Sequence, residues 1–339
     1  MEKVRLGDIC SKQSSRLAQK DLENMDGSYP IFGASGLIKK INTYDQKSEY
    51  VAVVKDGAGV GRTMLLPAYS SVIGTLQYLI PNDNVNAKYL YYAVKSRHLE
   101  KYYTGSAIPH IYFKDYKSEP IILADGIAQR KIALVLERVE KIIEEHKQQL
   151  EMLDTLIKAR FVEMFGEPLS NSKGWQTMSI AEVAPIKSRR GELIDEIWLL
   201  NLDAVEAQTG TVLFKHRVQR EEINASTVYF TTENVLYSKL RPYLNKVVMP
   251  DEDGVATSEM IPMYPLADRL TRSYLCYWLR SDAFVKHISE KVAGAKMPRV
   301  SMDYFQSLTI ELPPLDLQEQ FATFVVQVDK SKVSDFEKV

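Results

Sequence analysis

The amino-acid sequence predicts a mixed α/β protein with two similar globular domains that are separated by long helices. Three observations lead to this prediction. Motifs recur about 190 residues apart, one long segment contains neither glycine nor proline, and strand-like and helix-like runs alternate in each half. At 339 residues, two domains and a connector are the natural partition. We expect globular domains at residues 1–126 and 166–313, a connector helix at 127–165 and a second helix at 314–339.

The internal repeat is clearest in two pairs of motifs. The stretch 89–96 reads YLYYAVKS and is matched by YLCYWLRS at 274–281. The stretch 105–111, GSAIPHI, is matched by GAKMPRV at 294–300. The period has the length of a whole domain plus a connector rather than of a solenoid unit. Two copies of one domain predict two similar ligands, or one ligand with two similar halves.

The composition limits the class of protein. Hydrophobic residues make up 45% and charged residues 26% of the chain, which is ordinary for a globular protein. No apolar run reaches the length of a membrane span, no apolar signal core follows the N-terminus, and the two cysteines show no metal-like spacing. We therefore expect a cytoplasmic protein. The net charge of −1 argues against general polyanion binding, so any contact with nucleic acid must come from local basic surfaces.

The connector is predicted to be one continuous helix. Residues 127–165 are rich in good helix formers, and Gly166 supplies a stop signal. At 1.5 Å per residue such a helix is roughly 58 Å long, which is too long for one small domain. Its apolar residues recur at spacings of three and four, and we expect them to face a partner helix: Ile132, Val135, Val139, Ile142, Leu150, Leu153, Ile157 and Phe161.

The second helix supplies that partner. The economical arrangement is two helices packed as a coiled coil, with a globular domain at each end. The alternative is a connector helix that packs only on its own domain. Aligned with the first copy, the second helix is expected to be shortened by about two heptads.

Each domain is predicted to mix strands and helices. In the first, we expect strand-like runs at 50–54, 71–80 and 120–123 and a helix at 87–103 with Asn86 as its cap. In the second, we expect a helix at 270–285 and strands at 197–202, 228–230, 234–237, 246–249 and 308–312.

Two loops in each copy carry the candidate contacts. The first is a turn flanked by bases, and the second is a short loop with a proline and a base. Their basic side chains can reach DNA phosphates, and arginine can also form a fork onto guanine. The candidate DNA-binding residues are Lys55, Arg62, His110, Lys114, Lys239, Arg241, Lys246, Lys296 and Arg299. The alternatives are solvated surface charge for each base and a purely structural turn for the proline loop.

Enzyme chemistry is poorly supported by the sequence. The glycines at 57–61 lack the Gly-Lys-Ser/Thr ending of a phosphate loop, and the matching stretch 241–245 has no glycine. There is no Asn-Pro-Pro-aromatic or Asp-Pro-Pro-aromatic tetrapeptide of the amino-methyltransferase type. The five histidines do not cluster with acids or cysteines at metal spacing. We expect no catalytic residue, no metal and no cofactor in this chain.

The ordered set of motifs resembles the specificity (S) subunit of type I restriction–modification systems. The resemblance rests on LGDI at 6–9 and its counterpart IAEV at 180–183, on GSAIPHI at 105–111, on PPLDLQEQ at 313–320 and on KARFVEMFG at 158–166. It covers essentially the whole chain, and it is the order of the motifs, rather than any one of them, that is specific.

The resemblance implies a non-catalytic subunit that recognises DNA. Each globular domain would be a target-recognition domain for one half of a bipartite sequence, and the helices would form an antiparallel coiled coil that sets the gap. Two DNA-methylation subunits, which carry S-adenosylmethionine, would dock on the chain, and motor–nuclease subunits would join for cleavage. The shortened second helix leaves an alternative, a coiled-coil scaffold or regulatory truncated subunit that binds the methylation subunit without full DNA recognition. A self-contained DNA-modifying enzyme is the other rival.

Overall fold

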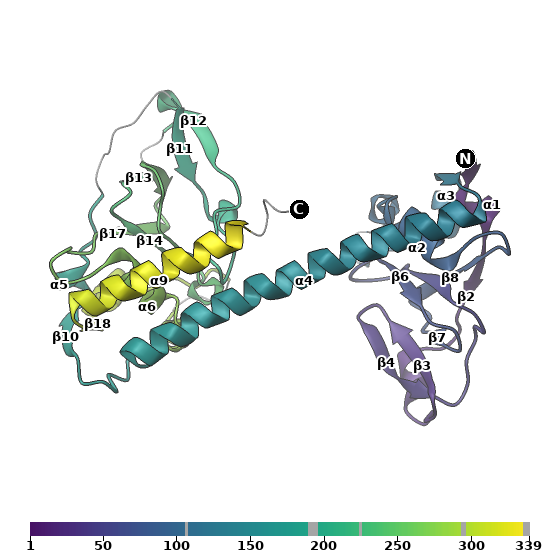
Figure 1. The fold of residues 1–339 in the computed structure, drawn as a ribbon, viewed down its shortest axis with the longest axis horizontal. Coiled ribbons are helices and arrows are strands. Elements are labelled where there is room, and N and C mark those ends of the chain that lie inside the picture. The colour runs from purple at the N-terminus through teal and green to yellow at the C-terminus, as the bar shows by residue number, and fades with distance from the viewer. Residues whose placement is uncertain (106–107, 189–195, 224–225, 293–295, 335–339) are drawn as a thin grey trace. The chain divides into compact units, whose positions relative to one another are not determined.

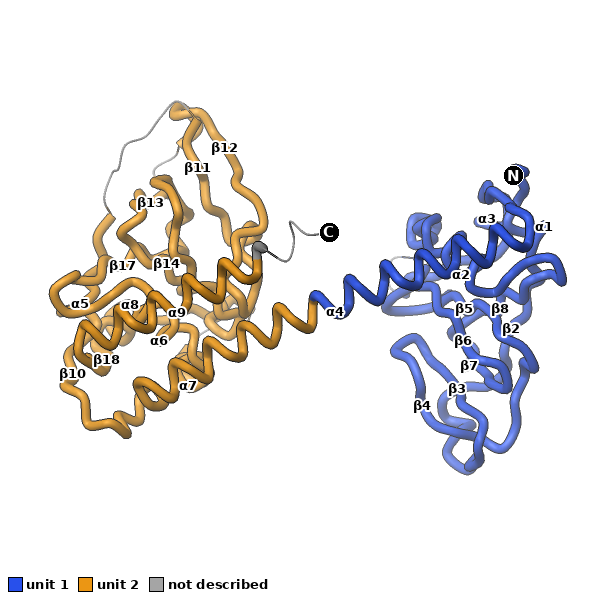
Figure 2. The backbone as a smooth tube through the Cα atoms, viewed as in Figure 1, with its two compact units in different colours: residues 1–146 blue, residues 147–339 orange. Residues whose placement is uncertain are grey.

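The computed structural model describes residues 1–105, 108–188, 196–223, 226–292 and 296–334. The chain divides into two compact units, Met1–His146 (unit 1) and Lys147–Val339 (unit 2), which Figure 2 shows in different colours. Helix α4 (Gly126–Phe165) begins in unit 1 and ends in unit 2. Each unit therefore combines a globular part with a portion of this helix.

In the described residues of unit 1, the strands form three sheets, which Figure 1 shows together with the helices of this unit. The strand orders are β2-β8-β5-β6, β4-β3-β7 and β1-β9. The elements are β1 (Glu2–Arg5), α1 (Leu6–Ile9), β2 (Cys10–Ser14), β3 (Tyr29–Gly33), β4 (Gly36–Ile41), β5 (Tyr50–Val54), β6 (Thr63–Leu66), β7 (Ser71–Val72), β8 (Leu76–Pro81), α2 (Ala87–Lys95), α3 (Phe113–Tyr116) and β9 (Pro120–Leu123).

The part of unit 2 that the structure describes also forms three sheets, with strand orders β12-β11-β16-β13, β15-β14-β17 and β10-β18. Its elements are β10 (Gln176–Ser179), α5 (Ile180–Val183), β11 (Glu196–Leu200), β12 (His216–Gln219), β13 (Thr227–Phe230), β14 (Val235–Ser238), β15 (Val247–Val248), β16 (Gly254–Thr257), β17 (Met260–Met263), α6 (Arg272–Leu279), α7 (Asp282–Ser289), α8 (Met302–Ser307), β18 (Thr309–Leu312) and α9 (Leu315–Ser334). The mixed α/β class predicted from the sequence is confirmed.

The internal repeat extends to the register of the strands. In unit 1, Ala52 of β5 pairs with Met64 on one side and Tyr78 on the other. In unit 2, Leu236 of β14 takes the corresponding place, between Val248 and Pro262. The parallel pair β3–β7 has its counterpart in β11–β16. Because a slip of one residue would turn every side chain to the other face, matched registers mean matched cores.

Helix α9 packs antiparallel against the later part of α4, within unit 2 (Figure 1). Asp154 of α4 forms an ion pair with Lys332 near the end of α9, at 2.7 Å. Closer to the end of α4, the ring of Phe161 lies 5.3 Å from that of Phe321, near the start of α9. A position later on one helix thus meets a position earlier on the other. This confirms the expected pairing of two antiparallel helices over this length.

The expected seam of α4 has two different environments. Ile157 and Phe161 are buried, at 0% and 3% exposure, while Leu150 and Leu153 are half-buried. Ile132 is half-buried, but three other seam residues of the first part of α4 are exposed: Val135, Val139 and Ile142. The buried seam residues belong to the part of α4 in unit 2, where α9 packs against it, and the exposed ones belong to the part in unit 1.

Two expected helices are shorter than the sequence suggested. The predicted helix 87–103 is wrong beyond Lys95, because His98 adopts a left-handed conformation (φ 52°) and a separate 3₁₀ turn follows. Its predicted cap is confirmed, since the Asn86 side chain accepts from Tyr89 N at 3.0 Å. The predicted helix 270–285 is two helices, because Ser281 caps a new one by accepting from Phe284 N at 3.2 Å.

The remaining expected elements differ in smaller ways. The run 71–80 comprises two strands, β7 and β8, and α4 ends at Phe165 before Gly166, whose φ of +87° suits glycine alone. In the part of the chain that the structure describes, no helix is long and apolar enough to cross a membrane.

Candidate nucleic-acid interface

Two loops that the sequence points to separately lie side by side in each unit. We call residues 55–62 of unit 1 and 239–246 of unit 2 the turn loops, and residues 105–111 and 294–300 the proline loops. Residues 106–107 and 294–295 of the proline loops lie outside the described residues. In each unit the two loops are joined by backbone hydrogen bonds, so the candidate basic side chains on these loops lie close together within that unit.

In unit 1, two hydrogen bonds join the loops. Gly57 N donates to Pro109 O at 2.9 Å, and Ile111 N donates to Lys55 O at 2.9 Å. A third bond, from Lys55 N to Thr75 O at 2.9 Å, anchors the turn loop to the chain just before β8. These bonds hold in place the backbone from which the side chains of the candidate site extend.

Unit 2 repeats the same three hydrogen bonds with different residues. Arg241 N donates to Pro298 O at 2.8 Å, and Val300 N donates to Lys239 O at 3.0 Å. Lys239 N donates to Glu259 O at 3.0 Å, just before β17. The two units therefore share a loop frame but carry unlike side chains on it.

A pocket of about 300 Å³ lies beside the joined loops of unit 1. Three lysines line it, Lys12, Lys55 and Lys114, together with His110 and the buried amide of Gln77. Lys114 also lies over the ring of Tyr112, 5.0 Å from its centre. Three ammonium groups around a small polar space provide the chemistry to hold an anion such as a DNA phosphate.

His110 is held by an acid at the edge of this pocket. Its Nδ1 is hydrogen-bonded to the Asp56 carboxylate, and the ring of Tyr112 packs edge-on against it at 4.0 Å. Lys55 Nζ lies 3.6 Å from the other oxygen of Asp56. Asp56 thus orients the imidazole and offsets part of the local positive charge.

The last bases of the two turn loops occupy equivalent backbone positions. Arg62 O accepts from Val54 N at 2.9 Å, and Lys246 O accepts from Ser238 N at 3.0 Å. The exposed Arg62 donates from Nη1 to Ala34 O at 3.0 Å, and the half-buried Lys246 donates from Nζ to the backbone oxygen of Leu202 at 2.6 Å. These interactions use one donor of each side chain, and within the described ranges neither Arg62 nor Lys246 forms an ion pair with a carboxylate.

The turn loops differ in backbone conformation from a phosphate-binding (P-loop) motif. Gly57, Gly59 and Gly61 have φ of +83°, +86° and +86° and open no helix. The second turn loop reaches the same left-handed region without glycine, at Arg241 and Asn245, each with φ 50°. Such a conformation is strained for arginine and is the kind of outlier that gathers at ligand sites.

The second unit presents its bases on the exposed side of the joined loops. Arg241, Lys296 and Arg299 are exposed, whereas Lys239 is half-buried. Arg299 donates from Nε and Nη2 to the Glu259 carboxylate at 3.1 and 2.9 Å. This hydrogen bond raises the pKa of the Arg299 guanidinium above its ordinary value, so the group stays charged.

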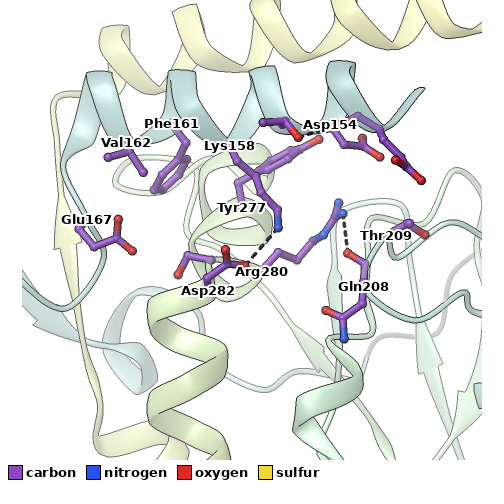
Figure 3. A pocket seen from close by; sticks show the side chains of 13 residues that line it. Asp154, Lys158, Phe161, Val162, Glu167, Gln208, Thr209, Tyr277, Arg280 and Asp282 are labelled. Carbon is purple, nitrogen blue, oxygen red and sulfur yellow. Dashed lines mark hydrogen bonds and ion pairs between the residues drawn. The ribbon is translucent and has the colours of Figure 1, made fainter. Parts of the chain in front are cut away.

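A second pocket, of about 310 Å³, lies in unit 2 between the later part of α4 and the segment that joins α6 to α7 (Figure 3). Lys158 points to Asp282 across it, at 3.1 Å, and Arg280 Nη2 donates to Gln208 O at 3.2 Å. Charges of both signs line this pocket, and Lys158 and Asp282 form an ion pair across it. Over the described ranges, no group of three or more His, Cys, Asp or Glu side chains is placed to hold a metal ion.

Several residues of the site escape sequence reasoning. Lys12 and Gln77 join the pocket of unit 1 only because β2 pairs with β8. Asp56 is the sequence neighbour of the predicted Lys55, so it could have been identified from the sequence as an acidic residue of the site. Glu259 carries no such signal, since only the pairing of β14 with β17 brings it to Arg299.

Comparison with known proteins gives one family. The family model described as "Type I restriction modification DNA specificity domain" matches the chain twice, over residues 1–154 and 172–337. The chain is 22% identical to the type I restriction enzyme EcoDI specificity subunit of Escherichia coli, over 96% of this chain and 80% of that protein. It is 25% identical to the MjaIX specificity subunit of Methanocaldococcus jannaschii, over 73% of this chain and 63% of that protein.

A solved structure has a similar fold. The crystal structure of the S subunit of a type I restriction-modification system from M. genitalium aligns with a TM-score of 0.58 at 15% sequence identity. The alignment covers 99% of this chain and 91% of that one.

Proposed function

This chain belongs to the type I restriction–modification DNA specificity family, and we propose that it is a non-catalytic subunit whose two units each read one half of a bipartite DNA sequence. One observation carries the proposal. The turn loop and proline loop are joined by the same two backbone hydrogen bonds in both units, a third equivalent bond anchors each turn loop to the chain before the next strand, and the side chains on the loops differ. A shared frame with unlike side chains suits two readers of the same kind of ligand with different sequences.

The side chains fall into two chemical groups. Basic side chains that form no ion pair among the residues that the structure describes, such as Lys114 and Arg241, suit DNA phosphates, which set affinity and register. His110 and Arg299 are each held in a fixed orientation by a carboxylate, which suits hydrogen bonds to the edges of DNA bases. The pocket of unit 1, with its three lysines, supports the phosphate role.

The exposed apolar face of α4 supports a role in assembly. Val135, Val139 and Ile142 are 57%, 46% and 43% exposed, an unusual amount of apolar surface in one helical row. We propose that two DNA-methylation subunits dock on the chain, one of them on this face, and bring S-adenosylmethionine and the chemistry. Motor–nuclease subunits would join the same complex for cleavage.

The test is a map of methylated adenines in a host that carries the methylation subunits with and without this chain. We expect methylation at one gapped sequence with two unlike halves, which disappears when the chain is removed. If the chain binds the methylation subunits but no sequence-specific methylation depends on it, it acts as a scaffold or regulatory subunit and the proposal fails. Methylation or cleavage by the purified chain alone would instead establish an enzyme.

A further inference from the structure

The residue after the proline of each proline loop is a base held by a carboxylate. His110 follows Pro109 and is hydrogen-bonded to Asp56, and Arg299 follows Pro298 and is bound by Glu259. The two acids are not equivalent in the repeat, because Asp56 belongs to the turn loop and Glu259 lies just before β17. The same arrangement is thus built in two different ways, which indicates that the acid–base pair itself is useful there.

In unit 2 the carboxylate leaves part of the guanidinium available. Glu259 takes the edge formed by Nε and Nη2, at 3.1 and 2.9 Å. Within the described part of the chain Nη1 has no hydrogen-bond partner, and the Arg299 side chain is 46% exposed. Nη1 and the second N–H of Nη2 form a planar pair of donors that points away from Glu259.

The position of this donor pair is fixed from two directions. Val300 N donates to Lys239 O at 3.0 Å, which ties the proline loop to the turn loop directly after Arg299. Leu240 and Arg299 also form an isolated β-bridge. An arginine held at both its backbone and its guanidinium loses little conformational entropy when it binds.

The charge of the pair argues against a backbone contact. Glu259 offsets the positive charge of Arg299, and a carboxylate so close to a phosphate would repel it. Two parallel donors instead match the O6 and N7 acceptors of guanine in the major groove, the commonest specific contact made by arginine. We propose that Arg299, positioned by Glu259, reads a guanine in the half-site that unit 2 binds. This inference rests on the proposed function, since it names one base of that half-site.

The experiment begins with the complex of the full chain and its methylation subunits in a host. Methylated adenines are mapped for the wild type, for Arg299→Ala and for Arg299→Lys. We expect both variants to relax a single position, a guanine, in one half-site and to leave the other half and the gap unchanged. Methylation directed by the unchanged half shows that the complex is folded.

The second stage uses a duplex with the mapped sequence in which that guanine is replaced by 7-deazaguanine, which lacks the N7 acceptor. We expect the wild-type complex to lose affinity for this duplex by at least about 5-fold but by less than about 150-fold, the upper end of the range for a whole bidentate contact, because O6 is retained. The Arg299→Ala complex should show no further loss. Glu259→Gln should weaken the preference for guanine while Arg299 is still present, because the donor pair is no longer held in place.

Lys296→Ala is the matched contrast, an exposed base of the same loop. If Lys296 contacts a phosphate, Lys296→Ala should weaken binding to DNA of every sequence. It should also reduce the slope of log K against log salt by about one. The inference is overturned if Arg299→Ala behaves in this way, if it relaxes a position that is not guanine, or if it leaves the half-site unchanged. Failure of the proposed function would look different, since the wild type would then direct no gapped sequence at all.

Discussion

Gln129 and Gln318 make the same set of hydrogen bonds in the two units. Each side-chain oxygen accepts from the backbone N–H of a helix cap, Asn86 for α2 at 2.8 Å and Thr271 for α6 at 2.9 Å. Each side-chain nitrogen donates to two backbone carbonyls, at 3.0 and 2.8 Å in both units. Both amides are buried, with 1% and 0% exposure. The start of α4 and the start of α9 are therefore anchored to their units in the same way.

Removing either amide should destabilise one unit only. Gln129→Ala and Gln318→Ala each leave a buried N–H and two carbonyls without their partner, which costs about 1–3 kcal/mol. Hydrogen exchange should show faster opening around α2 for the first variant and around α6 for the second. Gln149→Ala, at an exposed position of α4, is the control and should change neither. Equal effects on both units from one substitution would contradict independent anchoring.

The two parts of α4 should respond differently to substitution. Ile157→Ala removes a fully buried side chain and should lower the free energy of unfolding by about 2–5 kcal/mol. Val139→Glu changes an exposed position and should alter stability by less than about 0.5 kcal/mol, yet it should prevent co-purification with a methylation subunit.

Lys141→Glu, which changes charge on the same helix at a position outside the apolar row, is the control for the second variant. Retention of the methylation subunit by Val139→Glu would remove the proposed role of this face.

The pocket of unit 1 should contribute to the salt dependence of DNA binding. Lys12→Ala and Lys114→Ala each remove one ammonium group from the lining, so the slope of log K against log salt should fall by about one for each phosphate that is no longer bound. The sequence preference should stay the same. Lys3→Ala, on β1 and outside the pocket, removes the same charge and should leave the slope unchanged. A changed sequence preference would place a base, rather than a phosphate, in this pocket.

Glu140 makes the stability of unit 1 sensitive to acid. Burial raises its pKa, but hydrogen bonds from Lys95 Nζ at 2.5 Å and Tyr92 OH at 2.9 Å outweigh this, and the pKa lies below the ordinary value of 4.5. A carboxylate whose pKa is lower in the folded than in the unfolded protein stabilises the fold at pH values above the unfolded pKa. This contribution is lost as the pH falls through the folded pKa.

The unfolding midpoint of the wild type should therefore drop more steeply below pH 4.5 than that of Glu140→Gln. Glu151→Gln, an exposed glutamate of the same helix, should follow the wild type. Identical acid profiles for wild type and Glu140→Gln would contradict this account.

The order of the domains and long helices could be predicted from the sequence. Repeated motifs and the spacing of apolar residues are patterns that can be read from the sequence itself. Gly166 marks the end of α4, and Asn86 marks the start of α2. The break at His98 could not be predicted in this way, since only a small fraction of residues other than glycine adopt a left-handed conformation, and a single histidine does not mark one.

The candidate site also has parts that could be predicted from the sequence and parts that could not. The bases of both loops were named from the sequence, but their meeting depends on hydrogen bonds between segments far apart in the chain, such as Gly57 to Pro109. The acids that hold His110 and Arg299 differ in origin, so no alignment of the two halves could have paired Arg299 with Glu259.

The claim that each unit reads its own half-site has one most direct test. Methylated adenines are mapped in hosts whose methylation subunits are combined with the wild-type chain, with His110→Ala or with Arg299→Ala. The account predicts that His110→Ala changes the bases required in one half only, that Arg299→Ala changes the other half only, and that the gap stays constant. If either variant relaxes both halves together, the two units do not read separately and the account is wrong.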